Sequence, residues 1–172
     1  DLDSDGWIDA LHITFSEPVD DATVTAGNFA IAGASGLAFS STTNGDTADD
    51  GDIYITFTDG ALDTAAVPNL TYTAGTLKDR NGNSLANNGP TASTDLAAPV
   101  ILTATSAVGS TTLTVTFSEP VDTSNAGTGD LVTGDFSYTN ASGSGAASIS
   151  AIVDADASAD RIVTLTVNTA FI

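Results

Sequence analysis

The chain lacks cysteine and methionine, and only three of its 172 residues are basic. Without cysteine it can form no disulfide bond, thiolate metal site or thiol nucleophile. No apolar run approaches the roughly 20 residues that a membrane-spanning helix needs, and no basic-then-apolar signal peptide opens the chain. We therefore expect no membrane insertion. The chain opens inside a motif at Asp1, which favours a piece of a longer protein.

Positive charge is scarce, whereas negative charge is abundant. The 22 acidic residues and three basic residues give a formal net charge of -19. Nucleic acid and anionic membrane surfaces are poor partners, because binding to phosphate needs clustered lysine and arginine. Apolar residues make up 41% of the chain, which is within the globular range and argues against a disordered acidic tail. The carboxylates must therefore be solvated, bind cations, or both.

Helical periodicity is almost absent, and short alternating runs of β-branched or aromatic and polar residues take its place. This period of two predicts strands with one buried and one wet face, as in an antiparallel sandwich. The predicted strands are Ala10–Phe15, Asn28–Ala32, Ile53–Thr58, Leu70–Leu77, Val100–Thr105, Thr112–Phe117, Asp135–Thr139, Ala147–Val153 and Ile162–Asn168. The triplets Asn44-Gly45-Asp46 and Asn81-Gly82-Asn83 predict turns. Pro18 and Pro120 predict strand ends or sheet edges, because proline cannot donate to a ladder.

One seven-residue phrase occurs twice in the chain. Residues 14–20, Thr-Phe-Ser-Glu-Pro-Val-Asp, return unchanged as residues 116–122. A phrase repeated at domain-sized spacing indicates tandem copies of one module. We place the boundary near Asp95, at the end of a stretch, Ala86–Asp95, that we interpret as a linker. Residues 1–95 and 96–172 are thus predicted to be two tandem antiparallel β-sandwich domains.

The two copies are incomplete in different ways. Ile53–Phe57 aligns with Ile162–Thr166, but only the first copy continues into Asn69–Leu85. Conversely, the second copy begins with Val100–Thr105, for which the first copy has no equivalent. The first copy thus lacks an opening strand and the second its closing strands. Either the chain is a fragment of a longer array, or a neighbouring chain supplies a strand to the open sheet edge.

Three features resemble the bacterial immunoglobulin-like (Ig-like) domains found in tandem in S-layer proteins and large secreted adhesins. They are the strand ending in Phe-Ser-Glu-Pro-Val, the following Asn28-Phe29 or Asp135-Phe136 pair, and Tyr72 followed by Lys78-Asp79-Arg80-Asn81-Gly82-Asn83. The resemblance covers nearly the whole chain. It implies an all-β Ig-like fold and an extracellular, secreted or cell-surface location. It also implies a spacer, lattice or adhesion role, often with bound calcium, and no enzymatic activity.

The N-terminal segment predicts a calcium (Ca²⁺) site. Residues 1–9, Asp-Leu-Asp-Ser-Asp-Gly-Trp-Ile-Asp, place carboxylates at positions one, three, five and nine of a loop with glycine at six. A hard cation takes six or more oxygen ligands, and this spacing is that of the first part of a calcium loop. The segment is similar to EF-hand, dockerin and thrombospondin type 3 loops. The predicted ligands are Asp1, Asp3, Asp5, Trp7 through its carbonyl, and Asp9.

Position twelve departs from the calcium-loop pattern. His12 stands where an acidic residue would close the ligand shell, and Asp20 or Asp79 are possible extra ligands. The alternative is a solvated acidic turn, but four aligned carboxylates without cations would repel one another. The second copy has no acid in the matching residues 107–111. The loop is therefore an addition to the first copy that the fold does not need.

Acidic residues crowd one further loop in each copy. The first set is Asp46, Asp49, Asp50 and Asp52, and the set in the matching loop of the second copy is Asp154, Asp156 and Asp160. We interpret both as solvated hairpin tips, with weak calcium binding as the alternative.

Conventional catalytic arrangements are not supported. Glu17 and Glu119 lie one in each copy, which argues against a shared glycosidase-like pair. We expect Glu17 to form an ion pair with Lys78 or Arg80. His12 faces the polar side of its strand, and no Ser–His–Asp triad can be argued around it.

We therefore expect a structural extracellular module of an S-layer, surface fibre or adhesin stalk that calcium rigidifies. Its partners would be neighbouring Ig-like domains of the same protein or copies of itself. Two alternatives stay open. One is a polysaccharide- or cell-surface-binding module of a larger secreted protein, for which an aromatic content of 6% is low. The other is a filament subunit assembled by strand exchange.

Overall fold

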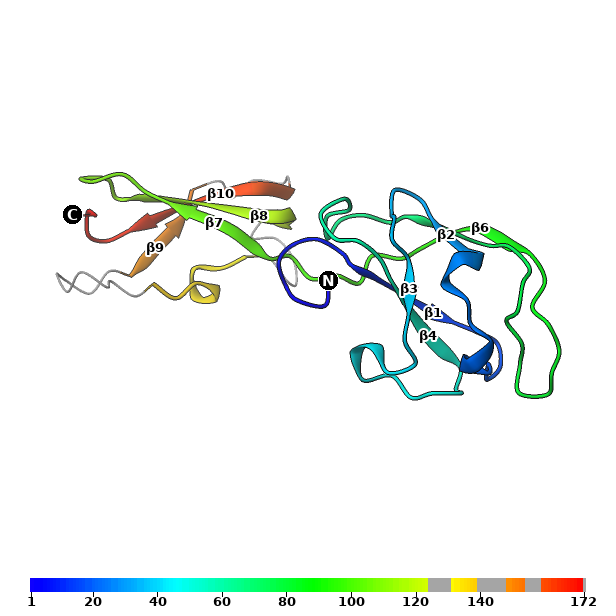
Figure 1. The fold of residues 1–172 in the computed structure, drawn as a ribbon. Coiled ribbons are helices and arrows are strands. Elements are labelled where there is room, and N and C mark those ends of the chain that lie inside the picture. Colours follow the sequence, from blue (N-terminus) through cyan, green and yellow to red (C-terminus); the bar gives the residue numbers. More distant parts are fainter. Residues whose placement is uncertain (124–130, 139–147, 154–158, 172) are drawn as a thin grey trace. The chain divides into compact units, whose positions relative to one another are not determined.

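The computed structural model describes residues 1–123, 131–138, 148–153 and 159–171 (Figure 1). Strands dominate, and the described residues contain short 3₁₀ helices but no α-helix. This part of the chain therefore holds no helix that is long and apolar enough to cross a membrane. The chain divides into two compact units, Asp1–Ala98 and Pro99–Ile172. The predicted all-β class with antiparallel sheets is confirmed, whereas the Ig-like identity of the units stays a prediction.

The first unit, which is described throughout, contains two three-stranded antiparallel sheets. One sheet has the order β1-β4-β3 and the other the order β2-β5-β6. The strands are β1 (Ala10–Thr14), β2 (Phe29–Ile31), β3 (Ala38–Phe39), β4 (Asp52–Thr56), β5 (Asn69–Tyr72) and β6 (Asn88–Ala92). The 3₁₀ helices Asp21–Thr23, Ala26–Asn28 and Thr43–Gly45 lie in the connections.

Both sheets of the first unit contribute to one hydrophobic core. Along β4, Ile53 and Ile55 are fully buried, whereas Tyr54 between them is not. From the other sheet, Phe29 and Tyr72 meet with their ring centroids 5.1 Å apart. The buried core residues are Ile8, Val19, Phe29, Ile31, Ile53, Ile55, Phe57, Tyr72 and Leu77. The alternation in the sequence thus directs one face of each sheet inward, which produces a sandwich.

The register of β1 and β4 decides which loops meet. Ala10 lies opposite Thr56, and Thr14 lies opposite Asp52. Because the two strands are antiparallel, the residues before Ala10 lie beside those after Thr56, and the residues after Thr14 lie beside those before Asp52. The loops therefore gather at the two opposite ends of this strand pair. These ends are about 17 Å apart, because β1 is five residues long.

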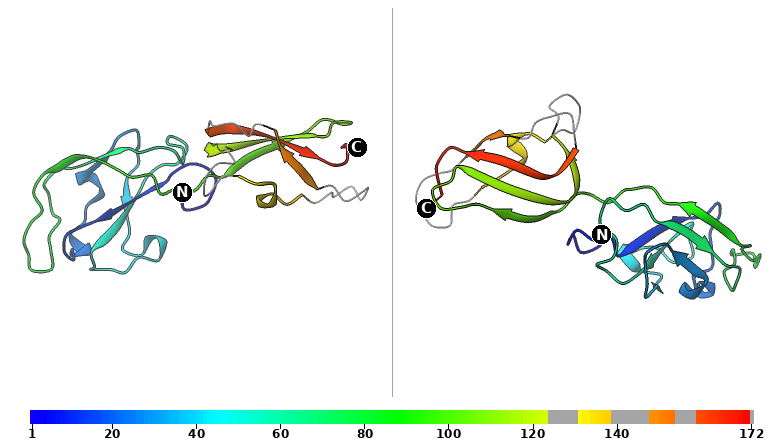
Figure 2. Two further views of the ribbon diagram at one scale, coloured as in Figure 1. Left: turned by 180° about the vertical axis from the view of Figure 1, so that it is seen from behind. Right: turned by 90° about the horizontal axis from the view of Figure 1, so that it is seen from above.

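The described strands of the second unit form a four-stranded antiparallel sheet of order β7-β8-β10-β9 (Figure 2). They are β7 (Ile101–Thr105), β8 (Thr112–Asp122), β9 (Ile149–Ile152) and β10 (Ala159–Val167), and a 3₁₀ helix spans Thr133–Asp135. Val115 lies opposite Val163, and both are buried on one face of the sheet. Leu131 and Phe136, on either side of the 3₁₀ helix, pack against this core.

Most predicted strands are confirmed with shifted ends. The two largest shifts are at the ends of β5 and β8, and β5 ends at Tyr72 because the chain then leaves the sheet and buries Leu77 from a loop. β1 ends at Thr14, before Pro18, as predicted. Pro120 does not end its strand, since β8 continues to Asp122. The pairing of β8 with β10 is irregular at this point, so Pro120 needs no ladder hydrogen bond.

Two predictions about the connections are wrong. Asp135–Thr139 is not a strand in its described part, because Thr133–Asp135 turns as a 3₁₀ helix, in which Asp135 Oδ2 accepts a hydrogen bond from Val132 N at 2.8 Å. Ala86–Asp95 is not a linker, because it contains β6, which pairs with β5. β6 is an edge strand and is exposed throughout, so it needs no apolar alternation. Residues 139 and 147 of the predicted strands lie outside the described residues.

The core of the first unit can be tested with a large-to-small substitution. We expect Ile53→Ala to lower the free energy of unfolding by about 2–5 kcal/mol, because it opens a cavity between the sheets. Val67→Ala is the matched control, since Val67 is 53% exposed, and it should change the free energy by less than about 0.5 kcal/mol. Urea unfolding followed by the fluorescence of Trp7, the single tryptophan, measures both. Equal losses in the two variants would contradict this core assignment.

Candidate metal centre

The predicted calcium loop precedes β1 and closes around the carboxylate of Asp1. Asp1 Oδ1 accepts hydrogen bonds from the backbone N–H groups of Ser4 at 2.8 Å and Asp5 at 3.3 Å, and Oδ2 accepts one from Gly6 at 3.1 Å. Gly6 has a φ of 99°, which residues with a side chain rarely adopt. The glycine therefore allows the chain to turn back over Asp1, as the sequence pattern requires.

Three of the predicted ligands converge in this loop. Carboxylate oxygens of Asp1, Asp3 and Asp5 all lie within 4.8 Å of one another. Oxygens this close can contact one ion, because Ca²⁺ binds its ligands at about 2.3–2.6 Å. Asp3 and Asp5 are exposed and Asp1 is half-buried, so an ion could enter from solvent. The donor set is hard oxygen only, which suits calcium or magnesium rather than a softer transition metal.

Asp9 and Trp7 lie at the end of the loop and support its shape. Asp9 Oδ1 accepts a hydrogen bond from Leu2 N at 2.8 Å, which ties the end of the loop to its beginning. Trp7 N donates to Asp5 Oδ1 at 2.9 Å, and the Trp7 residue is 37% exposed. A ligand role for the Asp9 carboxylate and the Trp7 carbonyl stays a prediction.

The loop is fastened to the segment that follows β4. Trp7 and Asp63 form an isolated antiparallel bridge, and Ile8 N donates to Leu62 O at 2.8 Å. Ile8 is buried in the core. The last residues of the loop are therefore held by the same sandwich that positions β1.

A fourth carboxylate, Asp59, approaches the loop from this segment. Loss of hydration raises the pKa of Asp59, and the neighbouring carboxylates of Asp5 and Asp3 raise it further. Sequence reasoning missed Asp59, because its place beside the loop depends on which strands pair. The antiparallel pairing of β1 with β4 places the residues after Thr56 beside those before Ala10.

The structure does not bring the suggested extra ligands to this loop. His12 lies on the open face of its sheet, as predicted, with its ring stacked on Tyr54 at a centroid distance of 4.5 Å. Its Nε2 contacts the Asp52 carboxylate. Asp20 lies past the other end of β1, where its Oδ1 accepts from Ala22 N at 3.1 Å and caps a 3₁₀ helix.

Asp79 is buried and organises the Asn81-Gly82-Asn83 turn. Its Oδ1 accepts hydrogen bonds from Asn81 N at 2.8 Å and Asn83 N at 2.7 Å, and its Oδ2 accepts one from Asn83 Nδ2 at 2.6 Å. The hydrogen bond from the Asn83 side chain, followed by those from the backbone, lowers the pKa of Asp79. Asp79 is therefore a turn-stabilising residue next to Val19, with which it forms a bridge.

The remaining candidates are scattered. Glu17 is exposed and Glu119 is buried. Among the described residues, the predicted ion pair of Glu17 with Lys78 or Arg80 is not formed, and Arg80 Nη1 lies 3.4 Å from Asp49 Oδ2 instead. Asp154 and Asp156 lie outside the described residues. Asp160 lies in β10, where it pairs with Val121 of β8.

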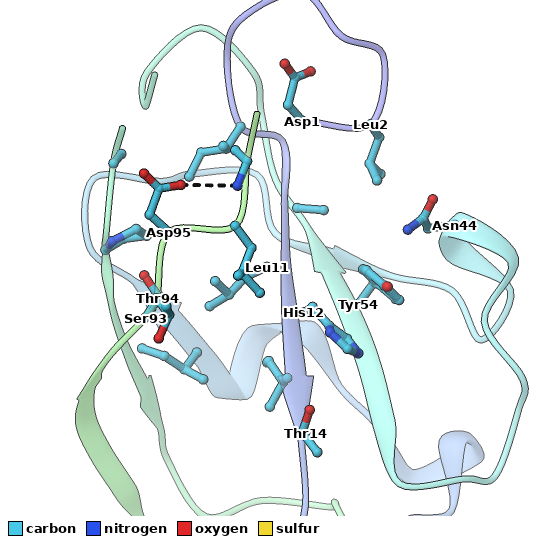
Figure 3. A pocket seen from close by; sticks show the side chains of 18 of the residues that line it. Asp1, Leu2, Leu11, His12, Thr14, Asn44, Tyr54, Ser93, Thr94 and Asp95 are labelled. Carbon is cyan, nitrogen blue, oxygen red and sulfur yellow. Dashed lines mark hydrogen bonds between the residues drawn. The ribbon is translucent and has the colours of Figure 1, made fainter. Parts of the chain in front are cut away.

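A hollow of about 770 Å³ lies along β1. Figure 3 shows Leu11 on the side of the Ser93–Asp95 segment, and His12 and Tyr54 on the side of Asn44. β1 is an edge strand of its sheet. The hollow therefore follows a strand edge and its two flanks.

Comparison with known proteins assigns no relative, because no protein-family model, curated protein or solved structure matches the chain. The resemblance to Ig-like domains stays a prediction. The case for a function therefore rests on the geometry of the acidic side chains.

The role of Asp79 predicts a pH-dependent effect of its substitution. The pKa of the folded carboxyl lies below the unfolded value of about 3.9. The stability that the ionised group contributes is therefore present above about pH 4 and is lost as the pH falls through the folded pKa. We expect wild type to be more stable than Asp79→Asn near neutral pH, and the difference to shrink toward about pH 2.

Urea unfolding at a series of pH values measures this difference. Asp95→Asn is the control, because Asp95 accepts a single backbone hydrogen bond, from Ala97 N at 3.1 Å. A difference between wild type and Asp79→Asn that does not depend on pH would contradict the role given to Asp79.

Proposed function

We propose that the chain is a structural β-sandwich module of a secreted or cell-surface protein, and that calcium rigidifies it through the N-terminal loop. The observation that carries the proposal is the convergence of Asp1, Asp3 and Asp5 in a loop that closes around Asp1. The role would be mechanical rather than catalytic.

Charge balance supports a cation at this loop. Three converging carboxylates, with Asp59 beside them, repel one another unless a positive charge lies between them. The chain has only three basic residues for 22 acidic ones, and in the described part of the chain no basic side chain forms an ion pair with these four carboxylates. Several carboxylates in one loop suit Ca²⁺ better than Mg²⁺, which usually takes one or two carboxylates and keeps several waters.

The position of the loop explains how an ion could stiffen the module. β1 begins directly after the loop, and the Asp9 carbonyl accepts a hydrogen bond from Phe57 N at 2.8 Å. An ion that orders residues 1–9 therefore also holds the start of β1 and the end of β4. Because such an ion binds the folded loop rather than the unfolded chain, it stabilises the whole unit.

The extracellular location follows from the chemistry of the proposal. Calcium loops of extracellular modules bind in roughly the 10⁻⁴–10⁻³ M range, which suits calcium-rich surroundings. The high net negative charge of -19 is better tolerated where salt and divalent ions screen it. The absence of cysteine means that bound ions, rather than disulfides, would provide the cross-links.

One observation favours a second candidate function, assembly by strand addition. In the second unit β7 pairs with β8, which carries the repeated phrase, whereas no described strand pairs with the outer edge of β1 in the first unit. The hollow along β1 leaves this edge accessible. A strand from another copy of the chain could add to it.

Light scattering after size exclusion tests this alternative, and a strictly monomeric, folded chain at high concentration would rule it out.

The calcium role predicts a ligand-dependent melting temperature. We expect calcium to stabilise wild type by about 2.7 kcal/mol when its concentration is 100 times Kd. The double variant Asp3→Asn/Asp5→Asn should lose most of the stabilisation that calcium binding at the N-terminal loop provides, because two of the converging carboxylates are removed. Thermal unfolding in CaCl₂ and in EDTA measures both proteins.

Asp95→Asn controls for the loss of a carboxylate elsewhere in the same unit and should respond to calcium as wild type does. An identical melting temperature of wild type in CaCl₂ and in EDTA would refute the calcium role. An unchanged calcium response in the double variant would remove the loop from it.

A further inference from the structure

A second acidic cluster lies at the opposite end of the β1–β4 pair. Carboxylate oxygens of Asp46, Asp50 and Asp52 all lie within 4.8 Å of one another. Asp46 and Asp50 lie in the loop that leads into β4, and Asp52 is the first residue of β4. The chain after β1 is fastened to this loop, because Val19 N donates to Asp50 O at 2.8 Å.

Asp21 brings a buried carboxylate without a hydrogen-bond partner to this end of the sheet. The residue is only 7% exposed, and neither Oδ1 nor Oδ2 has a hydrogen-bond partner among the described residues. Asp46 Oδ2 is likewise buried and has no hydrogen-bond partner in the described part of the chain. Ionised carboxylates are strongly disfavoured in such positions unless a cation or several donors face them.

Asp21 lies beside the loop that carries the cluster. It lies in the 3₁₀ helix Asp21–Thr23, beside the loop that leads into β4 (Figure 1), and its backbone N–H donates to Asp49 Oδ1 at 3.1 Å. Burial raises the pKa of Asp21, and the carboxylates of Asp49, Asp46 and Asp50 raise it further. The Asp49 N–H opposes this shift without reaching hydrogen-bond geometry. The hydrogen bond to Asp49 places Asp21 next to the loop that carries Asp46, Asp50 and Asp52.

The protein's own cations reach only the rim of this cluster. Arg80 Nη1 lies 3.4 Å from Asp49 Oδ2 and donates to Asp49 O at 3.1 Å. His12 Nε2 contacts Asp52 Oδ2. Asp21 has no ion pair or hydrogen bond at its carboxylate within the described part of the chain, so its charge is not balanced by these contacts.

We propose that Asp21, Asp46, Asp50 and Asp52 form a second divalent-cation site, of the calcium type. Four carboxylates from two segments offer more oxygen ligands than Mg²⁺ usually takes from protein, and a loop of this kind can adapt to the larger ion. The site shares no residue with the N-terminal loop and lies at the other end of the strand pair. An ion here would cross-link the segment after β1 to the segment before β4.

The test uses Asp21→Asn in the whole chain, with Ca²⁺ as the probe. In EDTA we expect Asp21→Asn to melt at or above the temperature of wild type, because the substitution removes a buried carboxylate that lacks a partner. In CaCl₂ the order should reverse. Calorimetric titration should show one calcium equivalent fewer, or an affinity at that site weakened by roughly tenfold or more, since even outer-shell changes cost about 10–100-fold.

Glu17→Gln is the matched control, because it removes one exposed carboxylate from the neighbouring turn without touching the four proposed ligands. It should keep the wild-type titration. Asp46→Asn, at a half-buried position, is a second variant that should lose the same calcium equivalent if Asp21→Asn does not fold. The proposal is overturned if calcium shifts the midpoint of Asp21→Asn as much as that of wild type, or if Glu17→Gln loses as much binding as Asp21→Asn.

The same titration in the Asp3→Asn/Asp5→Asn background separates this site from the N-terminal loop. An Asp21-dependent calcium equivalent that persists in this background supports the second site, whatever the loop does. If the loop variant removes all calcium binding and Asp21→Asn removes none, the loop stands and the second site is refuted.

Discussion

The antiparallel pairing of β1 with β4 is the constraint on which the rest of the first unit depends. Its register, with Ala10 opposite Thr56 and Thr14 opposite Asp52, turns the alternating apolar residues into the core. The same register brings together acidic residues that are far apart in the sequence. Asp59 lies beside the N-terminal loop at one end, and Asp21 is hydrogen-bonded to the loop before β4 at the other. One strand pair therefore organises both the core and the two acidic clusters.

The surroundings of each carboxylate decide whether it suits a cation. A chain with a net charge of -19 can keep most of its carboxylates in water. Asp79 shows the alternative solution, in which a buried carboxylate is satisfied by backbone and side-chain donors of its own turn. The Asp21 carboxylate, by contrast, forms no hydrogen bond within the described residues. Within one unit, the contrast between these two buried acids separates a structural carboxylate from one that suits a cation.

The sequence predicted local features well and long-range encounters poorly. Alternation located most strands, since a half-buried strand must repeat with a period of two. It missed β6, because an exposed edge strand carries no such pattern, and it mistook the 3₁₀ helix at Asp135 for a strand. The aspartate spacing predicted the N-terminal loop, and the structure brings Asp1, Asp3 and Asp5 together. It did not predict Asp59 or Asp21, because their positions depend on which strands pair. Asp20 and Asp79, the possible extra ligands in the sequence, instead cap a 3₁₀ helix and organise a turn.

The repeated phrase has partly different surroundings in the two units, since Val19 and Val121 are both buried, whereas Glu17 is exposed and Glu119 is buried. The central claim is that specific binding of a divalent ion, rather than general screening, stabilises the first unit. The most direct measurement is the free energy of unfolding, followed by Trp7 fluorescence, in CaCl₂ and in NaCl at the same ionic strength. Specific binding predicts a clearly larger value in CaCl₂. Equal values in the two salts would mean that the acidic clusters respond only to screening and would contradict the account.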